Sequence, residues 1–182
     1  MVKKGKYMNQ FISQLIDRRS IRNFNPDMVP DEAINDILEA GLYAAAGMNN
    51  QKLRLIAITD KNVRNEISQM NAKIMGKDMD PFYGAPVIII ALADKSAGTY
   101  IYDGSLALGN MMNAASSLGL GSCWIHRAKE EFESPEGKDL LKKWGLEGDF
   151  EGIGHLAVGY AANPEDMKAE RLERKDGRIV RI

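Results

Sequence analysis

The segment 100–118 constrains the fold of this 182-residue chain more than any other part of it. Its spacing is that of a helix, but its apolar residues lie on several sides instead of forming one stripe: Ile101, Leu106, Leu108, Met111, Met112, Ala115 and Leu118. A helix that is apolar on most sides has to be buried on most sides. A single chain of this length can hardly provide that much cover. We therefore expect a second copy of the chain to cover part of the helix.

The rest of the pattern predicts one domain, residues 1–182, with a central sheet and helices on both of its faces. Apolar residues at helical spacing predict further helices near 7–18, 30–42, 63–74 and 135–144. Strands are expected at 53–59, 87–92, 122–126 and 153–160, and the end of the chain, 178–182, alternates as a strand does. Residues 87–92 are apolar without alternation, which predicts a strand covered on both faces.

Composition excludes several classes of protein. The net charge is −1, so no bulk attraction to nucleic acid or to an anionic membrane is expected. Cys123 is the only cysteine, which leaves no internal disulfide and favours a reducing compartment. The longest apolar run, 85–93, is far too short to span a membrane. We expect a soluble, cytoplasmic protein.

A cluster of basic residues follows the first predicted helix. Arg18, Arg19, Ser20 and Arg22 lie within five positions and lead into a turn. Cations at the end of a helix also complement its dipole, and that alternative accounts for one or two arginines. Three guanidinium groups and a hydroxyl are better explained by an anion, such as a phosphate with a polyol tail.

A second polar cluster, Gly47-Met48-Asn49-Asn50-Gln51, directly precedes a predicted strand. Side-chain amides suit a flat ring that is edged with alternating donors and acceptors. The bland alternative is a polar loop after a helix, with Gly47 just past the helix end. A ligand that satisfies both clusters at once has a phosphate, a polyol and a flat ring. Flavin mononucleotide, FMN, has all three.

Other candidate chemistry is rejected. Cys123 and His126 would lie on opposite faces of their strand, so they do not form a nucleophile and base. His155 lies in another strand, where it is expected to be a core or interface residue. Two separated histidines and one cysteine cannot build a metal site, so no metal is expected. The chain also lacks the glycine-rich loops of Rossmann and P-loop proteins.

Several segments, in order along residues 10–182, resemble the nitroreductase family of flavin enzymes. They are the basic cluster 18–24, the helix 29–41, the amide loop 47–51, the strand entry 82–89, the helix and strand 110–125, and Val158-Gly159-Tyr160 with the later Arg174-Lys175. The resemblance implies an α+β fold with a mixed, largely antiparallel sheet. It also implies an intertwined homodimer with two FMN molecules at the interface. About 168–182 would form an arm that reaches the partner subunit and extends its sheet.

The same resemblance assigns residues to the phosphate end of FMN. Arg18 and Ser20 would hold the phosphate and the ribityl chain, and Arg19 would lie along the ribityl side. Arg174 or Lys175 would close the phosphate site.

At the ring end, Arg22 would approach the pyrimidine edge, where positive charge stabilises the anionic reduced flavin. Trp124 and Ile125 would present their backbone near N5. The other subunit would contribute the residues of the amide loop: Ala45, Ala46, Gly47, Asn49 and Gln51. Two positions depart from the family pattern. The family usually has Pro-Ser at Ala45-Ala46 and Pro-Trp at Lys52-Leu53.

The implied activity is reduction of a nitroaromatic, a quinone or another electron-poor molecule with NADH or NADPH as the donor. Hydride would pass to flavin N5, and the oxidant would then take the donor's place on the same face. No catalytic side chain is assigned, because the cofactor carries the chemistry. Two alternatives stay open. One is a different flavin chemistry, such as reductive dehalogenation or flavin destruction, and the other is a non-enzymatic or sensory FMN-binding protein.

Overall fold

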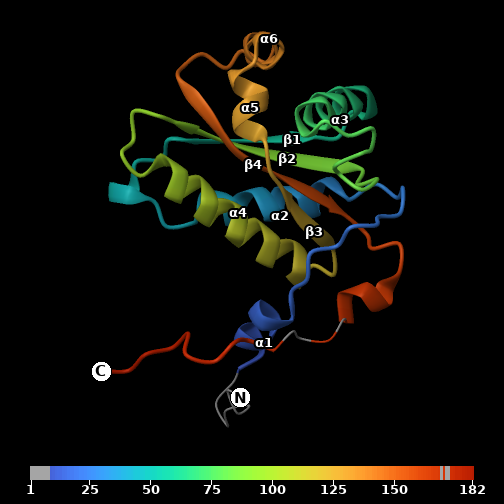
Figure 1. The fold of residues 1–182 in the computed structure, drawn as a ribbon, viewed down its shortest axis with the longest axis vertical. Helices are drawn as coiled ribbons and strands as arrows, with labels where there is room; N and C mark the ends of the chain where they lie inside the picture. Colours follow the sequence, from blue (N-terminus) through green and yellow to red (C-terminus); the bar gives the residue numbers. More distant parts are fainter. Residues whose placement is uncertain (1–8, 169, 171–172) are drawn as a thin grey trace.

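Within the described residues, 9–168, 170 and 173–182, the computed structural model is built on a four-stranded antiparallel sheet (Figure 1). The strand order is β1-β2-β4-β3. The strands are β1 Leu53–Ile58, β2 Val87–Asp94, β3 Gly121–Ile125 and β4 Phe150–Gly159. All three ladders are antiparallel, and Ser20 adds an isolated parallel bridge to Ser122. The predicted α+β class is confirmed.

The two central strands are the most apolar part of the chain. Every residue of β2 except Asp94 is buried, as the unbroken apolar run predicts. In β4, glycines let neighbouring elements approach closely. A Cβ on Gly152 would lie 2.3 Å from the carbonyl oxygen of Ala128, so the helix that begins there rests directly on the strand.

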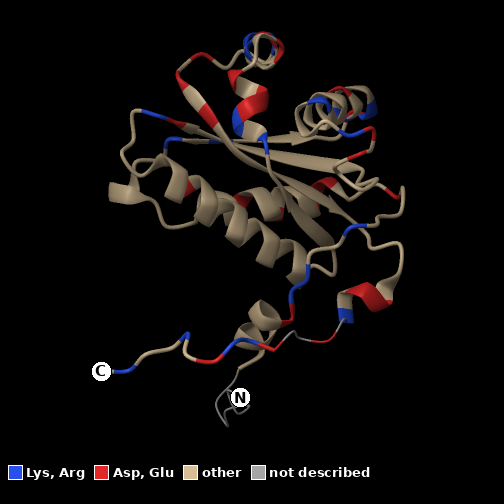
Figure 2. Ribbon diagram, in the orientation of Figure 1, with Lys and Arg blue, Asp and Glu red and all other residues tan. Residues whose placement is uncertain are grey.

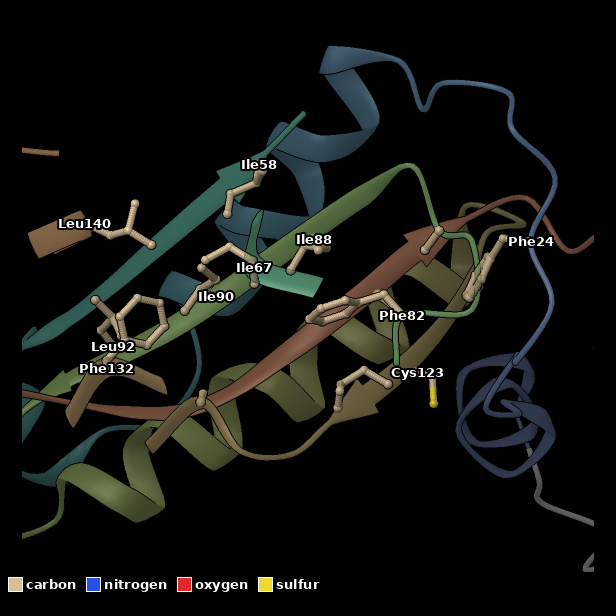
Figure 3. Packing of buried hydrophobic residues seen from close by; sticks show 14 of the residues in the cluster. Phe24, Ile58, Ile67, Phe82, Ile88, Ile90, Leu92, Cys123, Phe132 and Leu140 are labelled. Atoms are coloured by element: carbon tan, nitrogen blue, oxygen red, sulfur yellow. The ribbon is translucent and has the colours of Figure 1, made fainter. Parts of the chain in front are cut away.

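Helices cover both faces of the sheet (Figure 1). The helices α2 Asp31–Leu42 and α4 Tyr100–Ser117 pack on one face. The other face carries α3 Lys61–Met75, α5 Ala128–Glu133 and α6 Pro135–Lys143. Figure 3 shows the core on this second face, with Ile67, Ile88, Ile90, Phe82 and Phe132 in contact across α3, the sheet and α5. Sequence periodicity missed α5 because six residues are too short to show it.

The helix α4 is only partly covered by its own chain. The side of α4 that faces the sheet is buried. Apolar side chains elsewhere on the helix, Ile101, Tyr102 and Leu106, are exposed, as is Leu118 just after its end; Tyr102 is 70% exposed. Figure 2 shows α4 almost without charged residues, which is consistent with a helix that needs further cover. No helix among the described residues is long and apolar enough to cross a membrane.

The first helix, α1 Gln10–Asp17, presents apolar residues to solvent in the same region; residues 7 and 8 of the predicted helix lie outside the described residues. Phe11 is 64% exposed, and Leu15 and Ile16 are also exposed. A groove of about 370 Å³ separates α1 from α2 and α4, and it is lined by Phe11, Leu15, Tyr43 and neighbouring residues. Both α1 and α4 therefore leave large apolar side chains uncovered.

The end of the chain, which alternates as a strand does, pairs with no strand among the described residues of the single chain, and its pairing with a partner subunit stays a prediction. Residues 173–182 form neither helix nor strand, and Figure 1 shows them running past α1 and away from the sheet. Ile179 and Val180 are 71% and 77% exposed. Alternation makes a strand only where a neighbouring edge completes its hydrogen bonds, and this segment has no such neighbour within its own chain. Residues 169, 171 and 172 of the predicted arm lie outside the described residues.

Asp80 fixes the loop that enters β2. Its carboxylate accepts hydrogen bonds from the Arg64 guanidinium, the Ser68 hydroxyl at 2.7 Å, and the backbone N–H groups of Phe82 at 3.0 Å and Gly84 at 2.7 Å. Burial alone would raise the pKa of Asp80, but these four hydrogen bonds together lower it.

We expect Asp80→Ala to lower the free energy of unfolding by about 2 kcal/mol at pH 7, because it leaves several donors unpaired. The folded-state pKa of Asp80 lies below the unfolded value of about 3.9, so its stabilisation is complete above that pH and is lost as the pH falls through the folded-state pKa. Urea denaturation between pH 2 and pH 7 should show the gap to wild type closing at the acid end. The exposed neighbour Asp78 serves as a control, and an Asp78→Ala effect of the same size would contradict this account.

Candidate functional site

The basic cluster begins where α1 ends. Arg18 caps the helix, and its backbone N–H donates to the carbonyl oxygen of Gln14 at 3.0 Å. The Arg19 Nη1 group folds back and donates to the carbonyl oxygens of Ile16 and Arg18, both at 2.9 Å. Arg19 thus stabilises the C-terminal end of the helix, as the alternative explanation of the basic cluster predicts. Figure 2 shows the basic residues continuing from α1 toward the edge of β3.

Two guanidinium nitrogens in this cluster are buried without an acceptor. Arg18 Nη1 and Arg19 Nη2 find no hydrogen-bond partner among the described residues. Burial lowers the pKa of Arg18, and the charge of Arg19 lowers it further, while Cys123 acts in the opposite direction. Two desolvated cations side by side are costly unless an anion accepts their hydrogen bonds. These atoms therefore fit a phosphate group.

Ser20 joins the cluster to the sheet. It bridges to Ser122, and the N–H of Ile21 donates to the Ser122 carbonyl oxygen at 3.0 Å. The Ser122 hydroxyl oxygen is buried, also without a partner within the described part of the chain. Burial raises the pKa of the Cys123 thiol, against the lowering effects of Arg22, Ser20 and Arg18. Cys123 is therefore a neutral core residue beside the cluster, as the sequence predicts.

The edge strand β3 places the backbone of Trp124 differently from that of Ile125. Ser122 turns its carbonyl toward the basic cluster, and backbone groups alternate in direction along a strand. Trp124 therefore turns its backbone groups to the same open edge. Ile125 is paired with His155 on β4 and turns its groups inward. The geometry favours Trp124 over Ile125 for a backbone contact to a ligand at this edge.

The amide loop is held in an unusual backbone conformation. Its 3₁₀ turn, Gly47–Asn49, follows α2, and Met48, Asn49 and Gln51 have φ of 53°, 51° and 52°. Asn49 and Gln51 are exposed, as is Ala45, whereas Ala46, Gly47 and Asn50 are half-buried. A Cβ on Gly47 would lie 2.2 Å from Thr99 Oγ1, so only glycine fits at this point.

The structure does not bring the two predicted clusters together within one chain. The amide loop is hydrogen-bonded to Asp103 in the first turn of α4, whereas the basic cluster pairs with Ser122, just beyond the last turn. The helix axis between Asp103 and Ser117 runs about 20 Å. Figure 1 accordingly shows the loop and the start of β3 at opposite ends of α4.

The remaining predicted site residues are exposed. Arg22 extends to solvent beside β3, and Arg174 and Lys175 lie in the extended tail. Their contacts with a cofactor stay predictions.

Sequence reasoning missed two residues that position the amide loop, Asp103 and Asn50. Asp103 did leave a signal, since it is the only charged residue in the apolar segment 100–118. Asn50 left none, because nothing in the sequence separates it from Asn49.

A model of the nitroreductase family matches residues 15–78 and 73–160. The chain belongs to the nitroreductase family. It is 27% identical over 165 residues to a protein of Archaeoglobus fulgidus that carries the provisional name NADH dehydrogenase/NAD(P)H nitroreductase, and the alignment covers 88% of this chain and 90% of the relative. The resemblance seen in the motifs is therefore confirmed.

Solved structures agree with this assignment. The crystal structure of a nitroreductase with bound FMN from Bacteroides fragilis superposes with a TM-score of 0.86 at 26% identity, covering 96% of this chain and all 100% of the other. A nitroreductase in complex with FMN from Desulfovibrio desulfuricans has a TM-score of 0.70 at 27% identity, with 93% and 94% coverage. Both of these relatives hold FMN.

One departure from the nitroreductase pattern has a physical explanation. Where the family usually has proline, Lys52 supplies a backbone N–H that donates to Asn50 Oδ1 at 2.9 Å. Its Nζ also reaches Ser96 Oγ at 2.6 Å. This loop is thus restrained by hydrogen bonds where a proline ring would otherwise restrain it.

We expect Gly47→Ala to lower the free energy of unfolding by about 1–3 kcal/mol, the usual cost of forcing an extra carbon into a filled space. Gly98→Ala is the matched control, because a Cβ at this nearby glycine would meet nothing within 4 Å. Equal midpoints for the two variants in urea denaturation would show that the close approach of Thr99 does not exclude a side chain at position 47.

Proposed function

We propose that this chain is an FMN-dependent oxidoreductase that uses NADH or NADPH to reduce small electron-poor molecules, such as nitroaromatics and quinones. The observation that carries the proposal is the pair of buried guanidinium nitrogens of Arg18 and Arg19, which lack an acceptor among the described residues. Membership of the nitroreductase family and the FMN in related structures support the same cofactor.

Each predicted residue has a role in this proposal. Arg18 and Ser20 hold the phosphate and the start of the ribityl chain. Arg19 lies along that chain with Nη2, the buried nitrogen that has no partner among the described residues. Arg174 or Lys175 closes the phosphate site when the tail is in place.

The ring end of the site combines β3 with the amide loop. Arg22 approaches the pyrimidine edge, and the backbone of Trp124, next to Ile125, faces the ring. The amide loop contributes the exposed side chains of Asn49 and Gln51. Around them lie Ala45, Ala46 and Gly47, whose small size leaves room for the ring.

The amide loop of one chain serves the basic cluster of another in this proposal, so the functional unit is a homodimer. The two clusters are separated by the length of α4, and α4 and α1 leave apolar side chains exposed between them. A two-fold interface along α4 places the start of one copy's helix near the end of the other's. It also covers Tyr102, Leu106 and Phe11. The arm 168–182 belongs to the same single domain, and its described apolar residues, Ile179, Val180 and Ile182, pack on the second copy.

FMN, when bound, supplies hydride transfer in two half-reactions, first from the nicotinamide donor and then to the acceptor. The chain's own contribution is position and charge. The arginines bind one end, the loop and β3 fix the ring, and one face stays open for donor and acceptor in turn. We assign no general acid or base.

We expect the purified protein to be yellow and to release FMN on denaturation. Arg18→Ala should weaken FMN binding by about 10- to 150-fold, the loss of one charge-assisted contact. Its affinity for riboflavin, which lacks the phosphate, should stay close to that of wild type. Fluorescence titration of the apoprotein with both ligands measures these affinities.

Arg54→Ala is a suitable control, because Arg54 is an exposed arginine on β1, away from the basic cluster. If the Arg18→Ala protein binds FMN as tightly as wild type, the basic cluster does not bind the phosphate and only stabilises the end of the helix. A wild-type protein that binds no FMN would overturn the proposed function.

Steady-state kinetics test whether donor and acceptor bind in turn to the same face of the flavin ring. With NADH or NADPH and a quinone, double-reciprocal plots at several acceptor concentrations should be parallel. Because no ionising side chain is assigned to the reaction, the rate of cofactor reduction should change little between about pH 6 and pH 8. Intersecting lines would indicate a ternary complex, and the absence of any NAD(P)H oxidation would favour a non-enzymatic FMN-binding protein.

A further inference from the structure

The amide loop contains three residues other than glycine in the left-handed region, Met48, Asn49 and Gln51. Single residues of this kind are uncommon, and side chains such as Met and Gln pay a steric cost there. Such a conformation persists only where surrounding contacts impose it. Met48 makes no such contact, because it is 98% exposed.

The contacts that impose the conformation converge on Asp103, which is 3% exposed in the first turn of α4. Its Oδ1 accepts the N–H of Gly47 at 2.9 Å. Its Oδ2 accepts from Asn50 Nδ2 at 2.8 Å and from the Thr99 hydroxyl at 2.9 Å. One carboxylate thus ties both ends of the turn to the helix.

Asn50 completes the network from the loop side. Its Nδ2 also donates to the Gly47 carbonyl oxygen at 2.9 Å, and its Oδ1 accepts the N–H of Lys52. Burial would raise the pKa of Asp103, but the hydrogen bonds from Asn50, Gly47 and Thr99 outweigh it and lower the pKa. The carboxylate is therefore charged at neutral pH and acts purely as an acceptor.

The hydrogen-bond network gives the three neighbouring amide side chains of residues 49–51 different orientations. Asn50 turns inward to Asp103, and this leaves Asn49 and Gln51, its two neighbours, exposed on the outer side. We propose that Asp103 is a positioning residue for the flavin ring: it holds the amide loop so that Asn49 and Gln51 meet the ring edge. This inference rests on the proposed FMN site and adds a residue that does not itself touch the cofactor.

A double-mutant cycle tests the role of Asp103. We expect Gln51→Ala to weaken FMN binding about tenfold in the wild-type background. In the Asp103→Asn background the loop no longer presents Gln51, so Gln51→Ala should weaken binding less than about twofold. Asp103→Asn should also change the visible circular dichroism of bound flavin at saturation, which reports the asymmetry of the ring's surroundings.

Glu151→Gln is the matched control. Glu151 is a buried carboxylate on β4 that contacts the Tyr100 hydroxyl at 3.2 Å and Lys129 Nζ at 3.0 Å. It therefore meets the same first turn of α4 without touching the loop. We expect Glu151→Gln to lower thermal stability, to leave the flavin spectrum unchanged and to combine additively with Gln51→Ala.

Thr99→Val removes one donor to Asp103 while keeping the side-chain shape, and it serves if Asp103→Asn fails to fold. It should shift the flavin spectrum in the same direction by a smaller amount. Additive effects in the cycle, with an unchanged spectrum in Asp103→Asn or Thr99→Val, would overturn the role of Asp103 and leave FMN binding intact. A folded wild-type protein that takes up no FMN would overturn the proposed function and this inference together.

Discussion

The length of α4 is the constraint on which the rest of the structure depends. Asp103 ties the amide loop to its first turn, and β3 with the basic cluster follows its last turn. Packing of α4 on β2 and β4 fixes this separation of about 20 Å. A helix cannot shorten, so the two clusters of one chain do not meet on one small ligand. We propose one common explanation for the exposed apolar side chains of α4 and for the separation of the two clusters, namely a second copy of the chain.

Both clusters carry a local energetic cost. At the basic cluster the cost is desolvated positive charge, since Arg18 and Arg19 each bury a donor that has no acceptor in the described part of the chain. At the amide loop the cost is backbone strain at Met48, Asn49 and Gln51. In β2 and in α3, which Asp60 caps, local preferences and tertiary packing agree. Costs of this kind are typical of functional sites, where a ligand returns the energy.

Much of the fold could be predicted from the sequence, because the spacing of apolar residues over a long segment indicates a helix or a strand whatever the details of its packing. The helix α4, the buried strand β2 and the start of α2 after Pro30 were all predictable in this way. The direction in which individual backbone groups and side chains face was harder to predict. The family resemblance assigned Trp124 and Ile125 together, but only the bridge between Ser20 and Ser122 shows which of them faces the open edge. Likewise Asn49, Asn50 and Gln51 look alike in sequence, and a left-handed backbone decides which amide turns inward. Residues 178–182 alternate as a strand does but form none in the single chain, because alternation does not say which sheet edge pairs with them; pairing with a second copy stays a prediction.

Subunit complementation tests the central claim, that each site is shared between two chains. Arg18→Ala and the loop variant Asn49→Ala/Gln51→Ala should each bind FMN weakly as pure proteins. Co-expressed with different affinity tags and purified as mixed dimers, they should regain one tight site per dimer, because one site then receives a normal cluster from each chain. The other site carries both defects. Mixed dimers with no tight site would show that each chain builds its own site, and recovery of only monomers would remove the basis for sharing.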